Sequence, residues 1–388
     1  ELGLVHIDMN NGYDAFSLDN TRETLSDKPG FDTQETNLVS TKLTYTGWEH
    51  ADVIAIGSFA KSDIGYGYDE DWAFEGIHDW EYASTDHYLR ERDSVTTELR
   101  LISNESSKLF DESTSWVVGI YNRSEKETLD REYTYLDENY TSDFDTNNLA
   151  IYAQLDTEIN DKTTLTTGLR VEERAADFID SGTAFFNPKE VMVGGKLVLS
   201  YQLDENTLYY ASVNRGYKAG GFNTDGTLDE AFREFDSETL INYEVGTKAK
   251  LVDDKLILRA SAFYSDRKDM QVKSSFTKVR EDGSTEFIPA WLNAAEGFNK
   301  GLELETTYFA DEGITFYATL GLLRSEYDDY VNAEGKSLSG REQAHAPKYQ
   351  FSFGGNFDIT DTLYLNVSVE GKDSFYVSDT PVEDNAAR

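Results

Sequence analysis

The chain has 388 residues, no cysteine and a formal net charge of −38 at pH 7. The lack of cysteine excludes disulfides and zinc–thiolate sites, and the charge argues against nucleic acid as a partner, because binding to phosphates depends on lysine and arginine. No stretch approaches the roughly 18 apolar residues of a transmembrane helix, although a transmembrane β-barrel spreads its apolar signal over short alternating segments.

Several segments alternate between apolar and polar residues, which is the period of strands with one apolar and one polar face. In chain order, the clearest are residues 149–156, 164–172, 256–265 and 363–370. In the last segment, Leu363, Leu365 and Val367 share one face, and Tyr364 and Asn366 lie on the other. The 24 tyrosines and 22 phenylalanines also favour strands over helices. We therefore expect an all-β chain.

Short polar turns recur along the chain at intervals that suit pairs of long strands. They are expected at residues 47–50, 159–162, 203–206, 252–255, 310–313 and 359–362, with a looser turn at residues 104–112. Between consecutive turns there is room for two long strands and one long loop. This spacing predicts about fifteen strands, joined as repeated hairpins.

Long strands with short turns at one end and long loops at the other are typical of an outer-membrane barrel. A soluble sandwich or propeller has short turns at both ends and strands of about five or six residues, which fits this chain less well. Mid-strand charges such as Lys248, Glu303 and Glu305 are then expected to face a hydrated lumen. An odd number of strands cannot close such a barrel, so the pattern predicts that the chain is a piece of a longer protein.

The segment TLYYASVNRGYKAGGFN, residues 207–223, begins as an alternating strand and ends in glycines and two basic residues. A phosphate-binding loop needs lysine after its second glycine, then serine or threonine, and a helix behind it. Here Lys218 precedes the glycine pair, Phe222 follows it, and no helical pattern comes next. We therefore reject both a phosphate-binding loop and a dinucleotide-binding loop.

The same segment resembles the strand-and-loop signature of TonB-dependent outer-membrane receptors. Further segments resemble later strands of that family in the family's order, at residues 238–272, 293–308 and 346–357. The resemblance covers residues 207 to about 372, and RDSVTTELRLIS, from Arg92, resembles an earlier barrel strand more weakly.

This resemblance implies a transmembrane antiparallel β-barrel, with about fifteen strands present of a 22-stranded barrel. Residues 1–388 would form one partial barrel domain without the family's N-terminal plug domain and terminal strands. The implied location is the bacterial outer membrane, in contact with its lipid and lipopolysaccharide. The implied partner for energy is the TonB complex, which would act through the missing N-terminal region.

Aromatic residues crowd the segment between Tyr66 and Tyr88, which we expect to form a long exposed loop. Exposed aromatics are costly unless they pack or bind something. The candidate ligand contacts in this segment are Tyr68, Trp72, Phe74, Trp80 and Tyr82. Self-packing of the loop over the barrel mouth is the alternative interpretation.

Arg215 and Lys218 are further candidate ligand contacts, because they lie where their strand is expected to leave the membrane. Their charges suit an anionic ligand or lipopolysaccharide phosphates, and snorkelling at the membrane interface is the alternative. The five histidines show no spacing typical of metal ligands, and no catalytic arrangement is recognisable. We expect no catalytic residue, no metal site, no cofactor and no enzymatic activity.

The function implied by the resemblance is active uptake of a scarce ligand, with a ferric siderophore as the default. A glycan or a vitamin is an alternative ligand for the same kind of transporter. A passive porin without a plug and a soluble glycan-binding or glycan-cleaving β protein are alternatives from other classes.

Overall fold

The computed structural model describes residues 1–12, 21, 23–77, 83–182, 184–224, 228–279, 285–332, 335–377 and 386–387. Within these residues, sixteen strands form one sheet: fifteen pair in chain order, and the short β8 pairs with β7. Two 3-10 helices of three residues each, η1 (Glu105–Ser107) and η2 (Glu230–Phe232), interrupt the loops. No helix in these ranges is long and apolar enough to cross a membrane.

The chain divides into two compact units, which are described separately. Unit 1 comprises Glu1–Ser107, Val117–Tyr152 and Val171–Val191. Its strands pair antiparallel wherever the register is defined. It contains β1 (Leu2–Gly12), β2 (Phe31–Tyr45), β3 (Asp52–Asp69), β4 (Thr85–Ile102), β8 (Phe185–Phe186) and parts of β5 (Thr114–Tyr133), β6 (Tyr140–Asn160) and β7 (Thr163–Asp180).

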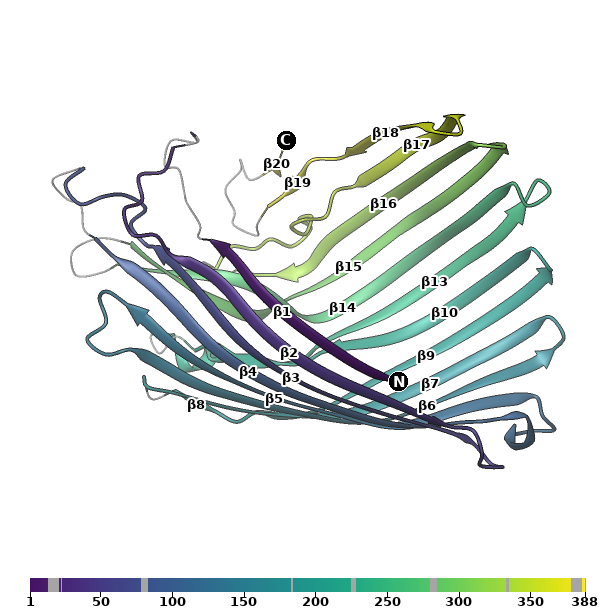
Figure 1. Cartoon of the computed structure of the whole chain (residues 1–388), viewed down its shortest axis with the longest axis horizontal. Coiled ribbons are helices and arrows are strands. Elements are labelled where there is room, and N and C mark those ends of the chain that lie inside the picture. The colour runs from purple at the N-terminus through teal and green to yellow at the C-terminus, as the bar shows by residue number, and fades with distance from the viewer. Residues whose placement is uncertain are drawn as a thin grey trace. The chain divides into compact units, whose positions relative to one another are not determined.

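Unit 2 comprises Lys108–Trp116, Ala153–Arg170 and Met192–Arg388. Its long strands also pair antiparallel in chain order (Figure 1). They are most of β9 (Lys189–Asp204), β10 (Thr207–Lys218), β13 (Glu238–Leu251), β14 (Leu256–Val279), β15 (Thr285–Asp311), β16 (Ile314–Tyr330), β17 (Tyr349–Thr360) and β18 (Leu363–Lys372). Short loop strands are β11 (Gly221–Phe222), β12 (Glu234–Phe235), β19 (Phe375–Tyr376) and β20 (Ala386–Ala387).

The expected turns are confirmed at the ends of these strands. Short turns lie at residues 49–50, 161–162, 205–206, 252–255, 312–313 and 361–362, and the looser one at residues 103–113 carries η1. Gly313 has φ +76°, a left-handed conformation that glycine adopts without strain. The fifteen long strands in the described ranges also agree with the number predicted from turn spacing.

The two faces of the strands differ as the alternation predicted. On β18, the side chains of Leu363, Leu365 and Val367 are 57%, 50% and 50% exposed. A continuous apolar surface of this kind suits contact with lipid rather than water. On the polar face of unit 2, a groove of about 840 Å³ includes Glu303 and Glu305 in its lining.

Some charged and polar groups in this groove bind one another across neighbouring strands. The Arg259 guanidinium lies 2.7 Å from a Glu305 carboxylate oxygen, and the Tyr210 hydroxyl donates a 2.6 Å hydrogen bond to Glu244. Lys248, which was expected on the polar face, also lines the groove. The groove is therefore lined largely by charged and polar side chains.

The expectation of one long loop from Tyr66 to Tyr88 was wrong at both ends. Strand β3 continues to Asp69 and β4 begins at Thr85, so Tyr66 pairs with Tyr88 within the sheet. Tyrosine favours strands, and aromatic side chains stabilise cross-strand pairs, so these residues extend the hairpin. The connecting loop spans residues 70–84, and residues 78–82 of it lie outside the described residues.

The glycines after β10 lie in a closely packed loop. A Cβ on Gly220 would lie 2.5 Å from the Phe235 carbonyl oxygen, so this position needs glycine for close backbone packing. Gly221 and Phe222 then pair with Glu234 and Phe235 as the β11–β12 hairpin. The loop after β10 is therefore a packed structure.

Candidate functional site

Five residues at the ends of β3, β4 and β5 form what we call the tyrosine–arginine cluster of unit 1. They are Tyr68, Asp86, Tyr88, Arg131 and Tyr133. Asp86 lies opposite both Tyr68 and Tyr133 in the ladder. The Arg131 guanidinium donates to the two Asp86 oxygens at 2.8 Å and 2.6 Å. Because Asp86 is only 1% exposed, this is a buried, bidentate ion pair.

The tyrosines complete the surroundings of this ion pair. The hydroxyls of Tyr68 and Tyr88 donate to Asp86 Oδ2 at 3.4 Å and 2.8 Å. The Arg131 guanidinium carbon lies 5.1 Å from the Tyr88 ring and 5.0 Å from the Tyr133 ring, within the range of cation–π contacts. The polar groups of the cluster therefore bind one another.

Tyr88 lies beyond the part of β4 that crosses a bilayer. The strand has 18 residues, whereas about 9–11 residues suffice to span the apolar core, and Tyr88 lies near the end remote from the short turn. Two main causes raise the pKa of the Tyr88 phenol above its ordinary value. Burial is the larger cause, and the hydrogen bond to Asp86 is the next. The hydroxyl is a proton donor to Asp86 at neutral pH, which lies well below even the ordinary pKa of a phenol.

Two neighbouring arginines of β4 are also neutralised. Arg92 Nε donates to Glu127 Oε2 at 2.8 Å, and Arg90 Nε lies 3.8 Å from the other Glu127 oxygen. Arg90 also lies over the Tyr88 ring at 5.2 Å. The two arginines therefore share one carboxylate of the protein itself, that of Glu127.

The predicted loop contacts are placed as follows. The Tyr68 ring lies 6.5 Å from Trp72, so these two candidates are neighbours. Phe74 is 42% exposed and lies further along the same loop. Trp80 and Tyr82 lie outside the described residues. A ligand contact by any of these five residues remains a prediction.

Arg215 and Lys218, both in unit 2, lie on opposite faces of β10. They are three residues apart in a ladder with β13 that has no register shift. Arg215 shares the exposed apolar face with Val213, and its Nη1 donates to the Val193 carbonyl oxygen. Lys218 belongs to the opposite face, and its ammonium lies 5.0 Å from the centre of the Trp291 ring.

Sequence reasoning missed Trp291, which is held rigidly by Asn223. The Asn223 side chain accepts from the Trp291 N–H at 2.8 Å and donates to the Trp291 carbonyl at 2.8 Å and the Phe232 carbonyl at 2.7 Å. Asn223 is 6% exposed, whereas Trp291 is 39% exposed. The backbone of Trp291 is thus fixed from the RGYKAGGFN segment while the indole ring remains accessible.

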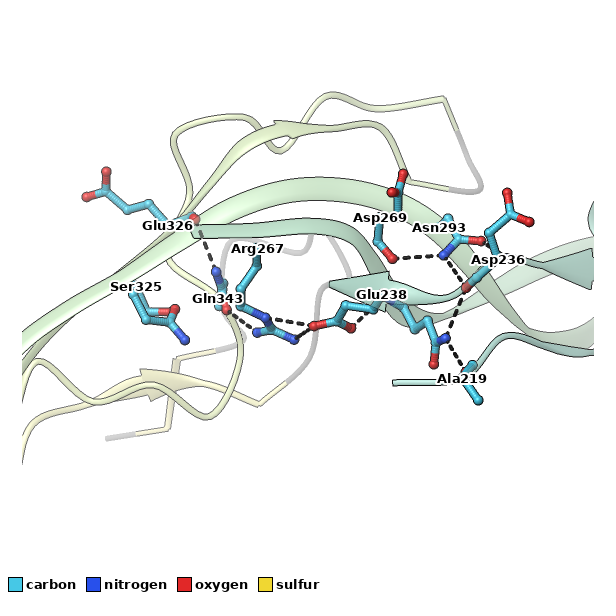
Figure 2. Close-up of polar contacts among 11 residues, drawn as sticks. Ala219, Asp236, Glu238, Arg267, Asp269, Asn293, Ser325, Glu326 and Gln343 are labelled. Atoms are coloured by element: carbon cyan, nitrogen blue, oxygen red, sulfur yellow. Dashed lines mark hydrogen bonds and ion pairs between the residues drawn. The ribbon is translucent and has the colours of Figure 1, made fainter. Parts of the chain in front are cut away.

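A buried polar network supports the loops around this position (Figure 2). Glu238 is 7% exposed; it forms an ion pair with Arg267 and accepts from the Gln271 N–H at 3.0 Å. Arg267 also donates to Gln343 Oε1 at 3.3 Å, and Gln343 Nε2 donates to the Glu326 carbonyl at 3.1 Å. The network ties the segment after β16 to β13 and β14.

The same network holds the loop between β10 and β13. Gln271 Nε2 donates to the carbonyls of Ala219 at 2.7 Å and Asp236 at 3.1 Å. Asn293 Nδ2 donates to the carbonyls of Asp236 at 2.9 Å and Asp269 at 2.8 Å (Figure 2). The only sequence signal for this network was the resemblance of the segment beginning at Glu238 to a family strand.

In the described ranges, no three His, Asp or Glu side chains are arranged to hold a metal ion. The arrangement instead offers paired charges, hydrogen-bonded loops and accessible aromatic rings. Groups of these kinds can contact a ligand, and their doing so here remains a prediction.

Comparison with known proteins agrees with this architecture. The family model described as TonB dependent receptor-like, beta-barrel, matches residues 5–387. The pesticin receptors of Yersinia pestis and Yersinia enterocolitica are each 25% identical over 320 residues, covering 76% of this chain and 44% of the relative. The chain therefore spans less than half the length of these relatives.

Solved structures share the fold. The ferric yersiniabactin uptake receptor FyuA from Yersinia pestis has a TM-score of 0.69 at 20% identity, over 90% of this chain and 52% of that one. The ferric-catecholate import receptor Fiu from E. coli also has a TM-score of 0.69, at 14% identity, over 99% of this chain and 63% of that one. The chain belongs to the TonB-dependent receptors of the outer membrane and carries their β-barrel fold.

Proposed function

We propose that this protein takes up a ferric siderophore across the outer membrane, with energy supplied through TonB. The observation that carries the proposal is the family match over residues 5–387, together with the neighbours of the fold. Several of those neighbours are named as receptors for iron chelates, namely ferric yersiniabactin, a ferric catecholate, ferric preacinetobactin and ferric citrate.

The site geometry supports binding at the strand ends rather than chemistry. The loops that follow β10 and β16 are fixed by buried hydrogen bonds, so ligand contacts on them are preorganised, which lowers the cost of binding. We expect no enzymatic activity. We also infer that a plug domain and a TonB-contacting segment accompany this barrel in the whole protein, since its relatives are about twice as long.

A glycan is the second candidate ligand, because exposed aromatic rings such as Phe74 and Trp291 can stack on sugars. A passive porin is the alternative from another class. Contact of the exposed apolar face with lipid, and of interfacial basic residues with lipopolysaccharide, remains a prediction.

Uptake of radioactive iron by iron-starved cells tests the proposal. Iron would be supplied as ferric yersiniabactin, as a ferric catecholate and as ferric citrate, to wild-type cells, to cells lacking this receptor and to cells lacking TonB. We expect both deletions to abolish uptake of the same chelate. Uptake through the receptor that persists without TonB would support a porin, and induction of the receptor by a polysaccharide instead of by iron starvation would support a glycan transporter.

A further inference from the structure

Trp291 has two lysines as neighbours in unit 2. The Lys218 ammonium lies 5.0 Å over its ring, and Lys273 is its direct partner in the β14–β15 ladder. Directly opposite residues in a ladder have Cβ atoms about 5 Å apart, so both lysines border the indole. In the described part of the chain, neither lysine forms an ion pair with a carboxylate. We call these three residues the cation–indole platform.

Uncompensated lysines are unexpected in a chain with a formal net charge of −38. Several other cations of the protein are neutralised by adjacent carboxylates, as Arg131 is by Asp86 and Arg92 by Glu127. The platform therefore presents positive charge that no carboxylate of the described residues neutralises.

The platform is rigid at its backbone and open at its ring. Asn223 fixes both the N–H and the carbonyl of Trp291, at 2.8 Å each, while the side chain stays 39% exposed. Gln271 and Asn293 fix the neighbouring loop through its carbonyls. An aromatic residue held in this way loses little conformational freedom when a ligand stacks on it.

We propose that Lys218, Trp291 and Lys273 bind an anionic aromatic group of the ligand, a phenolate or catecholate face of a ferric chelate. The indole supplies a stacking surface, and the two ammonium groups supply charge-assisted contacts to the aromatic oxygens. A non-aromatic anion such as ferric citrate would use only the lysines, and a neutral sugar only the indole. The proposal rests on the siderophore function proposed above and narrows its ligand class.

The test measures binding of a ferric catecholate and of ferric citrate to the full-length receptor in detergent, by equilibrium titration. For the catecholate, we expect Trp291→Leu to weaken binding about tenfold or more, and Lys218→Gln or Lys273→Gln to weaken it about three- to tenfold. Added salt should reduce the wild-type affinity, because exposed charges are screened. Trp291→Leu should leave ferric citrate binding unchanged.

A matched control pair exists in the same unit. The Lys300 ammonium lies 4.9 Å over the Phe298 ring. Lys300 lies two and four residues before Leu302 and Leu304 on the same strand, so it shares their exposed apolar face. Lys300→Gln and Phe298→Leu should leave catecholate affinity unchanged. Equal effects of the platform and control variants, or no effect of either, would overturn the proposal.

A second readout separates failure of the platform from failure of the siderophore function. The iron-free anion 2,3-dihydroxybenzoate should quench tryptophan emission of the wild type, and Trp291→Phe, which removes one of five tryptophans, should abolish that quenching. If no ferric chelate binds but this quenching is present, the siderophore function is wrong and the platform stands. If a ferric chelate binds wild type and Trp291→Leu equally well and quenching is absent, the platform is wrong and the function stands.

Discussion

The tyrosine–arginine cluster of unit 1 and the cation–indole platform of unit 2 are built from similar groups and differ in one respect. Both place basic side chains against aromatic rings at about 5 Å. In the cluster, Asp86 accepts hydrogen bonds from Arg131 and two tyrosines, so the positive charge of Arg131 is neutralised within the protein. In the platform, no described carboxylate pairs with Lys218 or Lys273.

This difference suits the cluster to stabilising the fold and the platform to recognising a ligand. An ion pair whose carboxylate is buried and accepts several hydrogen bonds is disrupted at a large cost, so the cluster should order the ends of β3, β4 and β5. A rigid aromatic ring beside unpaired cations contributes little to folding and is available to a ligand. Aromatic density alone therefore does not identify a binding site.

The largest effect is expected when the cluster loses its carboxylate. Asp86→Ala leaves the Arg131 guanidinium without its buried partner, which should cost about 3–5 kcal/mol of local stability. Hydrogen–deuterium exchange of the amides in β3, β4 and β5 measures this loss. Glu91→Ala, which removes the exposed partner of Lys61, is the matched control and should leave exchange unchanged. Similar exchange in both variants would contradict the role assigned to Asp86.

A slightly smaller effect is expected in the network of unit 2. Glu238→Gln removes the charge that pairs with Arg267 but keeps the side-chain shape, which should cost about 2–3 kcal/mol. Exchange should increase at the amides of Gln271 and Gln343, because both depend on this network. Protection of those amides at the wild-type level would show that the loops are held by other contacts.

An intermediate effect is expected when Asn223 is replaced. Asn223→Ala removes three hydrogen bonds around Trp291, and we expect a loss of about 1–3 kcal/mol. Tryptophan fluorescence anisotropy should fall, and catecholate affinity should fall severalfold. Asn122→Ala is the control, because it also removes a hydrogen-bonded asparagine side chain but lies in unit 1. It should change neither quantity. An unchanged anisotropy in Asn223→Ala would remove the argument for a rigid platform.

The smallest effect is expected from Tyr68, one of the aromatic residues that the sequence analysis named as candidate ligand contacts. Tyr68→Phe loses one 3.4 Å hydrogen bond to Asp86, which keeps its bonds to Tyr88 and Arg131. We expect less than about 1 kcal/mol of destabilisation and less than a twofold change in ligand affinity. A tenfold loss of ligand affinity without loss of structure would mean that the ligand binds at the cluster. It would contradict the conclusion that the cluster serves stability.

The fold was predictable because its signals are local. Alternation in segments such as residues 363–370 and turn residues such as those at 312–313 fix strand, face and hairpin from neighbours in sequence. The family followed from ordered motifs, beginning at residues 207–223. The ends of β3 and β4 were mistaken for loop because a tyrosine-rich segment reads as a strand only when its partner strand is known.

The proposed binding groups were less predictable because they depend on distant partners. Lys218 could be named from its motif, but Trp291 lies 73 residues further along the chain (291 − 218), and nothing local marks it. Arg215 and Lys218 looked equivalent in sequence, and only the pairing of β10 shows that they occupy opposite faces. Whether a cation has a carboxylate partner depends on which residues the neighbouring strands place beside it, and those residues can be distant in sequence.

Anomalous scattering at the iron edge, from crystals of the full-length receptor soaked with a ferric catecholate, tests the central claim most directly. The account predicts an iron peak beside Trp291, with an aromatic ring of the chelate stacked on the indole and its oxygens facing Lys218 or Lys273. An iron peak beside Tyr68 and Tyr88, with the chelate contacting none of the platform residues, would contradict it.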